Sequence, residues 1–290
     1  MKDATPGSFS LERVIITVLI IAIVLLCILF RMPDPRRYSL EIKQRAQLKS
    51  IETVISLWES EFDAYPPSDA LDVAGAQYCG AMKLCEAVMG QDILGYHPDS
   101  DFKSDGTDGK GKVLYPDSNT PSIEAYRDNL GERKGPYLPL DNANTYRLAD
   151  LYGQSNTGPF DPNHFAICDV FKRFKHRRTR KKVGMPILYY KADRSKTAHD
   201  ITDPNNPENI YDYKDNHDLL ALGVPGKPGV KHPMYEDPRI FYEITWNAKN
   251  VTKLMPHRAD TYILLSAGPD GLYGTKDDIA NFDWKWKRQE

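Results

Sequence analysis

An uninterrupted apolar run near the N-terminus constrains this chain more than any other feature. Residues 14–30 read VIITVLIIAIVLLCILF and contain no charged side chain. A run of that length reaches the lower limit for a helix that crosses a bilayer. A cleaved secretory signal has a shorter apolar region followed by small residues, whereas Arg-Met-Pro follows this run. The sequence therefore predicts a transmembrane helix over residues 8–31 and attachment to a membrane through residues 14–30.

A second helical pattern follows the apolar run. Apolar side chains recur there at intervals of three and four residues, which places them on one face of a helix. Pro66 and Pro67 end the pattern, because proline is poorly tolerated beyond the first turn of a helix. The sequence therefore predicts an amphipathic stem helix over residues 32–65 that packs on a head. Its apolar stripe consists of Leu48, Ile51, Val54, Ile55, Trp58 and Phe62.

The rest of the chain has the composition of a folded protein. Hydrophobic residues make up 41% and charged residues 27%, and the 21 prolines and 19 glycines predict many turns and long loops. Segments rich in β-branched and aromatic residues predict strands at 187–192, 240–246 and 261–266. The expected fold class is α+β: an N-terminal transmembrane helix continues into an amphipathic helix, which packs on a small antiparallel sheet with long loops. The formal net charge of −2 produces no overall field that favours nucleic acid, and none is expected as a partner.

A short polar leader precedes the apolar run. It contains Lys2 and ends at Gly7, and Glu12 is the fifth residue after that glycine. This arrangement resembles the type IV prepilin signal, in which a prepilin peptidase cuts after a glycine. The resemblance implies processing between Gly7 and Ser8, although the family usually has phenylalanine at the position of Ser8. It also implies that Glu12 pairs with the N-terminal amine of a neighbouring subunit during assembly, since a carboxylate beside a bilayer is unfavourable when unpaired. Arg13 offers Glu12 an alternative, internal partner.

Three further segments resemble the pilin-like family called the major pseudopilin, or protein G, of type II secretion systems. Residues 58–66 look like the end of its long helix, with a tyrosine-proline pair, and residues 135–138 and 186–190 resemble its next landmarks. The resemblance covers the two ends of the chain. Residues 66–238 are largely unmatched and are interpreted as an inserted or extended head region.

Three carboxylates and three glycines lie close together near the C-terminus. Residues 261–279 read TYILLSAGPDGLYGTKDDI. Glycines permit tight turns that direct carbonyl oxygens inward beside carboxylates, and calcium takes six to eight such oxygens. A plain polar hairpin between two strands is the alternative. The loop closely resembles the calcium loop of protein G, and this resemblance implies ligands from Asp270 and one or both of Asp277 and Asp278, with carbonyl oxygens of Ala267 or Ser266.

Other motifs carry weaker signals. Residues 99–112 match part of an EF-hand loop, but Lys103 and Lys112 occupy two ligand positions, which favours a solvated loop. The strongly basic run 172–182 could bind nucleic acid, anionic lipid or acidic polysaccharide, and an exposed loop is the preferred interpretation. His-Asp dyads at 199–200 and 217–218 have no accompanying ligands, and no nucleophile motif is present, so no enzyme is predicted.

The cysteines and the flanking charges leave two questions open. Cys79, Cys85 and Cys168 have no spacing that assigns a disulfide or a zinc site. Arg31, Arg36 and Arg37 follow the apolar run, and the positive-inside rule would place that side in the cytoplasm. The prepilin resemblance places the head outside the cytoplasm instead, and that orientation is preferred.

The sequence thus predicts a pilin-like structural subunit of a type II secretion pseudopilus or related filament, single-pass in the bacterial inner membrane. Its expected partners are further copies or other pseudopilins. The alternative is a stand-alone anchored binding or enzymatic domain on a pilin-like stem. The expected segments are a leader (1–7), a transmembrane helix (8–31), a stem helix (32–65), the inserted head region (66–238) and C-terminal strands with the calcium loop (239–290).

Overall fold

The computed structural model of the chain describes residues 14–22, 35–118, 122–139, 143–175, 182–249 and 254–283. They belong to two compact units, Met1–Leu40 and Glu41–Glu290. In the first unit, residues 14–22 are helical and their apolar side chains are exposed. The predicted processing residues Gly7 and Ser8 and the assembly residue Glu12 lie outside the described residues.

The structure does not bear out the predicted transmembrane helix. Among the described residues, no helix combines the length and the apolar composition that a membrane crossing requires. The remainder of the predicted segment, 8–13 and 23–31, lies outside the described residues. The predicted fold class is therefore corrected to α+β without a membrane-spanning helix among the described residues.

The stem pattern corresponds to helix α2 (Pro35–Phe62). From Glu41 onward this helix belongs to the second unit, and the predicted stripe is its buried face: Leu48, Ile51 and Ile55 are almost completely enclosed. The helix stops at Asp63, whose φ of 56° is left-handed, just before the Pro66-Pro67 pair. The 3–4 periodicity therefore predicted the buried face correctly, because the period of an α-helix is a local property.

The head contains a small antiparallel sheet of strands β5 (Leu188–Lys191), β6 (Tyr262–Ser266) and β7 (Ile279–Ala280), in the order β5-β6-β7. Leu188 pairs with Leu265, and Leu265 pairs in turn with Ala280. Every residue of β6 is buried, which explains its continuous apolar sequence. Two-stranded sheets are formed by β1 (Thr145–Arg147) with β2 (Phe165–Ile167), and by β3 (Phe174–Lys175) with β4 (Lys182–Val183).

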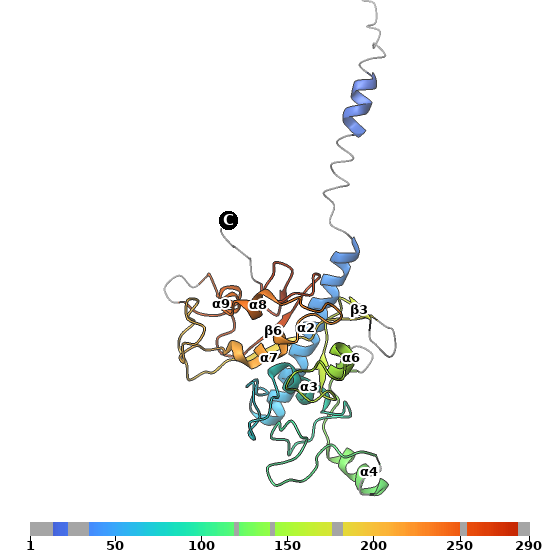
Figure 1. Cartoon of the computed structure of the whole chain (residues 1–290), viewed down its shortest axis with the longest axis vertical. Helices are drawn as coiled ribbons and strands as arrows, with labels where there is room; N and C mark the ends of the chain where they lie inside the picture. The colour runs from blue at the N-terminus through green and yellow to red at the C-terminus, as the bar shows by residue number, and fades with distance from the viewer. Residues whose placement is uncertain are drawn as a thin grey trace, which may run out of the picture. The chain divides into compact units, whose positions relative to one another are not determined.

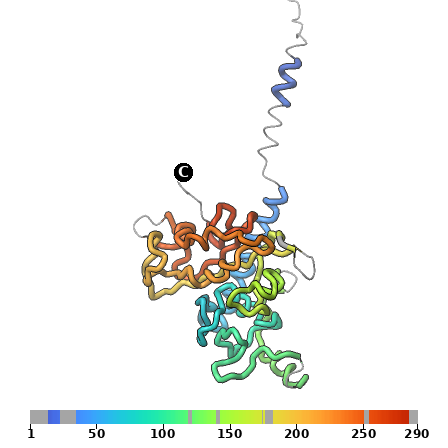
Figure 2. Tube along the Cα trace, viewed as in Figure 1, coloured from blue at the N-terminus to red at the C-terminus, as the bar shows by residue number. Residues whose placement is uncertain are grey.

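Short helices and irregular chain complete the head (Figures 1 and 2). Helix α3 (Gly80–Met89) is buried along its whole length and packs against β2 and β5. The remaining helical elements are α4 (Ile123–Glu132), α6 (Leu148–Tyr152), η1 (Tyr213–Asn216), α7 (His217–Ala221), α8 (Pro233–Glu236) and α9 (Arg239–Thr245). The described part of the chain is thus α+β with small antiparallel sheets.

One predicted strand is wrong. Residues 240–246 were expected to be extended because they are rich in aromatic and β-branched side chains, but they form most of helix α9. Ile240, Phe241, Tyr242, Ile244 and Thr245 are all buried in this helix. A helix enclosed on most sides loses its amphipathic pattern, so composition alone does not distinguish it from a buried strand.

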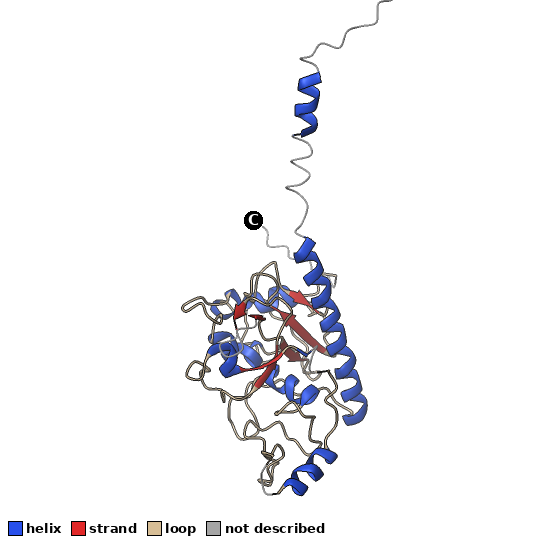
Figure 3. Cartoon of the chain, turned by 90° about the vertical axis from the view of Figure 1, so that its right-hand side faces the viewer, coloured by secondary structure: helices blue, strands red, loops and turns tan. Residues whose placement is uncertain are grey.

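Polar contacts join α2 to the head. Gln47 Nε2 donates to the carbonyl of Cys168 at 2.9 Å, and Gln44 Oε1 accepts from the amide of Val170 at 2.9 Å. Glu52 forms an ion pair with Arg258, close to the start of β6. Figure 3 shows α2 running beside the strands of the head. The helix is therefore held both by its apolar stripe and by hydrogen bonds to the segment after β2.

Candidate functional site

The loop between β6 and β7 turns back tightly on itself. Gly268 adopts a φ of 55°, and a Cβ atom there would lie 1.6 Å from the carbonyl oxygen of Asp277. Only glycine permits this approach, because a side chain would collide with backbone. Gly271 and Gly274 also have positive φ values, of 76° and 88°. The three glycines thus close the loop in which the sequence placed a calcium site.

Asp278 is the most deeply buried carboxylate of this loop, with 6% of its surface exposed. Its Oδ2 accepts a hydrogen bond from the amide of Gly274 at 2.7 Å. Its Oδ1 is buried and has no hydrogen-bond partner among the described residues. Burial, followed by the negative charges of Asp270 and Asp277, raises the pKa of Asp278 well above its usual value. A cation at Oδ1 would satisfy this oxygen and reverse the effect on the pKa.

The other two carboxylates are half-buried. Asp270 Oδ1 accepts from the amide of Leu272 at 2.8 Å, which forms a tight Asx turn. The amide of Asp277 donates to Thr275 Oγ1 at 3.2 Å. Local turns thus hold the backbone of both acids, and the charges of both raise the pKa of Asp278.

The predicted ligand set is only partly brought together. Within the described residues, no group of three or more His, Cys, Asp or Glu side chains is spaced to hold a metal ion. Asp270, Asp277 and Asp278 thus share one loop without forming a closed three-carboxylate cage. The oxygen chemistry nevertheless suits calcium, since carboxylates and backbone carbonyls are its usual ligands and one carboxylate oxygen here is unsatisfied.

Ser266 and Ala267 are fully buried at the end of β6. The hydroxyl of Ser266 donates to Asp169 Oδ2 at 3.1 Å and accepts from the amide of Gly268 at 3.2 Å. The Ser266 side chain is therefore committed to anchoring the loop. Any contribution of Ser266 or Ala267 to a cation would come from backbone carbonyl oxygens, as the resemblance implied.

Asp169 supports this loop and was missed by the sequence analysis. It is 1% exposed and also accepts from the amides of Phe171, at 3.1 Å, and Met185, at 3.3 Å. Burial raises its pKa to about 7, although these hydrogen bonds oppose the rise. Gly184 lies so close to Asp169 that a Cβ there would be 2.1 Å from the carboxylate. A single aspartate after a short apolar segment carries no sequence signal for such a role.

The EF-hand-like loop over residues 99–112 contains its own cation. Lys103 Nζ donates to Thr107 Oγ1 at 2.6 Å and to the carbonyl of Asp108 at 3.3 Å, and lies 3.6 Å from Asp105 Oδ2. The ammonium group of the chain thus takes oxygen contacts that a metal ion would otherwise need.

The histidine dyads serve packing in the described structure. His199 Nε2 donates to the carbonyl of Tyr242 at 2.8 Å, and burial lowers the pKa of His199 to about 4. His217 stacks on Tyr235 with 4.8 Å between ring centroids. His217 of α7 thus contacts α8, and His199 contacts α9.

The cysteines and the basic run complete the sequence candidates. Cys79, Cys85 and Cys168 are free and buried, and burial raises the pKa of Cys79 to about 12. The ends of the basic run 172–182 form strands β3 and β4, while residues 176–181 lie outside the described residues.

Comparison of the chain with protein-family models, with curated proteins and with solved structures yields no match.

Proposed function

We propose that this chain is a pilin-like structural subunit of a type II secretion pseudopilus or a related filament, with a calcium-stabilised head outside the cytoplasm. The observation that carries the proposal is the unsatisfied oxygen of Asp278, buried in a glycine-closed loop beside Asp270 and Asp277. A structural cation is the simplest partner for that oxygen. The resemblance to pilin-like proteins at both ends of the sequence is the reason for proposing a filament.

The outer face of α2 supports a role in assembly. Tyr38, Ile42 and Leu57 are large apolar side chains that stay exposed on this helix. They lie away from the buried stripe, so the helix has apolar side chains available to a second subunit. In a filament, contacts of that kind would be buried between neighbouring helices.

The N-terminal part of the proposal rests on sequence. A prepilin peptidase would cleave between Gly7 and Ser8, and Glu12 would pair with the new amine of a neighbouring copy or of another pseudopilin. The apolar residues 14–30 would attach the chain to the bacterial inner membrane. No catalytic role is proposed, and nucleic acid is not among the proposed partners.

Crosslinking of cells that express the full chain at native level tests this function. We expect a ladder of oligomers for the wild type and its loss for Glu12→Ala, with the amount of Glu12→Ala chain in the membrane fraction unchanged. A matched control is Glu124→Ala, which removes an exposed carboxylate from α4. A wild-type chain that remains monomeric beside an active secretion system would refute the filament.

A stand-alone binding domain on a pilin-like stem is the second candidate. It is favoured by one specific observation, a charged pocket in the head lined by residues of α2, β5 and the segment around η1. The crosslinking ladder separates the two candidates, because a stand-alone domain does not require assembly. Genes for a secretion ATPase and a prepilin peptidase beside this one would also favour the filament.

A further inference from the structure

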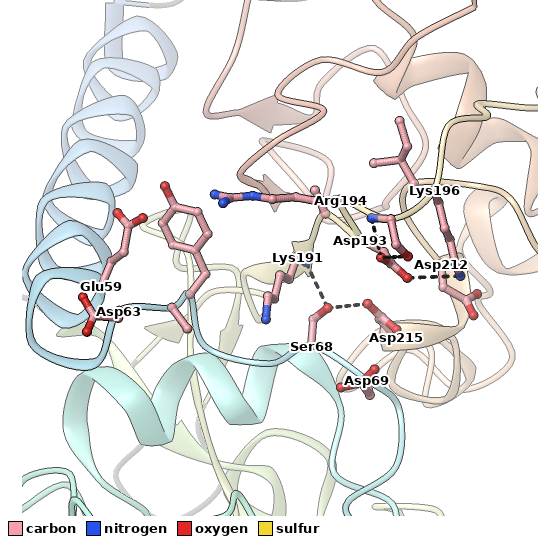
Figure 4. A pocket seen from close by; sticks show the side chains of 15 residues that line it. Glu59, Asp63, Ser68, Asp69, Lys191, Asp193, Arg194, Lys196, Asp212 and Asp215 are labelled. Carbon is pink, nitrogen blue, oxygen red and sulfur yellow. Dashed lines mark hydrogen bonds and ion pairs between the residues drawn. The ribbon is translucent and has the colours of Figure 1, made fainter.

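A pocket of about 470 Å³ opens in the head beside the C-terminal end of α2. Three stretches of the chain line it: the end of α2 with the following turn, the end of β5 with the loop after it, and the segment leading into η1. Figure 4 shows Glu59 and Asp63 on the side of α2, Asp212 on the opposite side, and Lys191 between them. None of these residues belongs to the β6–β7 loop, so the pocket is independent of the proposed calcium site.

The carboxyl group of Asp215 lies at the buried side of the pocket, and only 8% of this residue is exposed. Its Oδ2 accepts a hydrogen bond from the hydroxyl of Ser68, and that hydroxyl accepts from the amide of Lys191 at 2.9 Å. Among the described residues, no hydrogen bond engages the other oxygen, Oδ1. Asp215 therefore presents an acceptor to the pocket from a fixed position.

Negative charge exceeds positive charge in this pocket. Six carboxyl groups and three basic side chains line it. Two of the basic groups have partners already: Lys196 lies 3.7 Å from Asp193, and Arg194 donates to the carbonyl of Asp260 at 2.8 Å. Lys191 has no ion pair with any residue that the structure describes. The three basic side chains together carry fewer charges than the six carboxyl groups that line the pocket.

Asp69 and Asp212 affect the pKa of the buried Asp215. Besides burial, the charges of Asp212 and Asp69 raise the pKa of Asp215, while Ser68 and Lys83 oppose the rise. Neither Asp69 nor Asp212 forms an ion pair with a described residue. The pocket thus holds oxygen acceptors and an excess of negative charge around an open volume large enough for a small ligand.

We propose that this pocket binds a protonated amine or guanidinium group, which contacts the oxygens of Asp69, Asp212 and Asp215. Such a group carries several N–H donors and a charge, and so fits acceptors that come from different segments.

Two sources can supply this chemistry. A free oligoamine is one, and the lysine and arginine side chains of the basic run 172–182 of a second copy are the other. That run has the charge opposite to the pocket. Both sources present the same nitrogen groups, so the pocket is defined by those groups and the experiment separates the sources.

Calorimetric titration of the purified full-length chain tests the proposal with three probes: spermidine, free arginine and a synthetic peptide of residues 172–182. We expect at least one probe to bind, with an affinity that falls as salt is added. Asp69→Asn combined with Asp212→Asn should weaken binding about tenfold, since each charge pair at an exposed site contributes modestly. Lys191→Gln should strengthen binding several-fold, a gain that misfolding does not produce. Asp128→Asn, an exposed acid on α4, should change nothing.

The probes also identify the source. Tighter binding of spermidine than of the peptide assigns the pocket to a free oligoamine. Tighter binding of the peptide, together with crosslinking between Glu59→Cys and a cysteine in the run of a second copy, assigns it to subunit contacts. Absence of binding by all three probes overturns the proposal. Equal binding by the wild type and the Asp69→Asn, Asp212→Asn chain overturns it as well.

Discussion

Calcium should stabilise the head, and the structure indicates how Asp278→Asn should change that response. Without calcium, the buried Asp278 carries an unsatisfied oxygen and neighbouring negative charge. An unsatisfied buried polar group costs about 1–3 kcal/mol, and a charge makes the cost larger. Replacing the carboxylate by an amide removes the charge at nearly constant shape. The variant without calcium should therefore be as stable as the wild type without calcium, or more stable.

The gain from calcium is a linkage effect. A ligand that binds only the folded state stabilises it by RT ln(1 + [L]/Kd), which is about 2.7 kcal/mol at a hundredfold excess over Kd. Extracellular calcium modules bind with Kd values of about 0.1–1 mM, so about 10 mM calcium reaches that excess for the tighter sites. For a head of this size, about 1 kcal/mol shifts the melting temperature by roughly 2–4 °C. The expected wild-type shift is therefore about 5–10 °C.

Thermal melts of the full chain with chelator and with added calcium provide the assay. Wild type should show the shift, whereas Asp278→Asn and Asp270→Ala should not respond to calcium. Asp128→Asn should respond as the wild type does, because Asp128 is exposed on α4, away from the loop. A wild-type melt that is identical with chelator and with calcium would refute the reasoning and leave the loop as a hairpin.

Three further outcomes are expected. Burial raises the pKa of Asp169 to about 7, so its protonated form favours the folded state; its contribution should be complete below about pH 4, decline as pH rises, and be lost above about pH 7. Denaturant unfolding from pH 4 to 8 should show this decline for the wild type and a smaller one for Asp169→Asn. Ile51→Ala, at a fully enclosed position, should lower the free energy of unfolding by about 2–5 kcal/mol, whereas Leu57→Ala, 50% exposed on the same helix, should change it by about 0.5 kcal/mol or less. Mass spectrometry of chain extracted from cells with active prepilin peptidase should find Ser8 at the N-terminus, and an intact leader would contradict processing after Gly7.

The sequence anticipated those features that depend on neighbouring residues. The stripe of α2 was visible because helical period relates residues three and four apart, and Pro66 and Pro67 marked the end of the helix. Strands β5 and β6 were visible as short runs of β-branched and aromatic residues. The glycine-rich loop was visible as a motif, since its turns are made by residues within one short segment.

Tertiary packing decided the rest. Helix α9 consists of residues whose composition suggested a strand, and most of them are buried in the head. Asp169 supports the β6–β7 loop only because β2 and β6 bring positions 169 and 266 together. The charged pocket joins residues near 65, 193 and 213, which no local pattern relates. Burial and long-range neighbours set the charge state of Asp278 and Asp215, because desolvation and Coulomb energy depend on spatial surroundings, whereas the sequence by itself records only the order of residues.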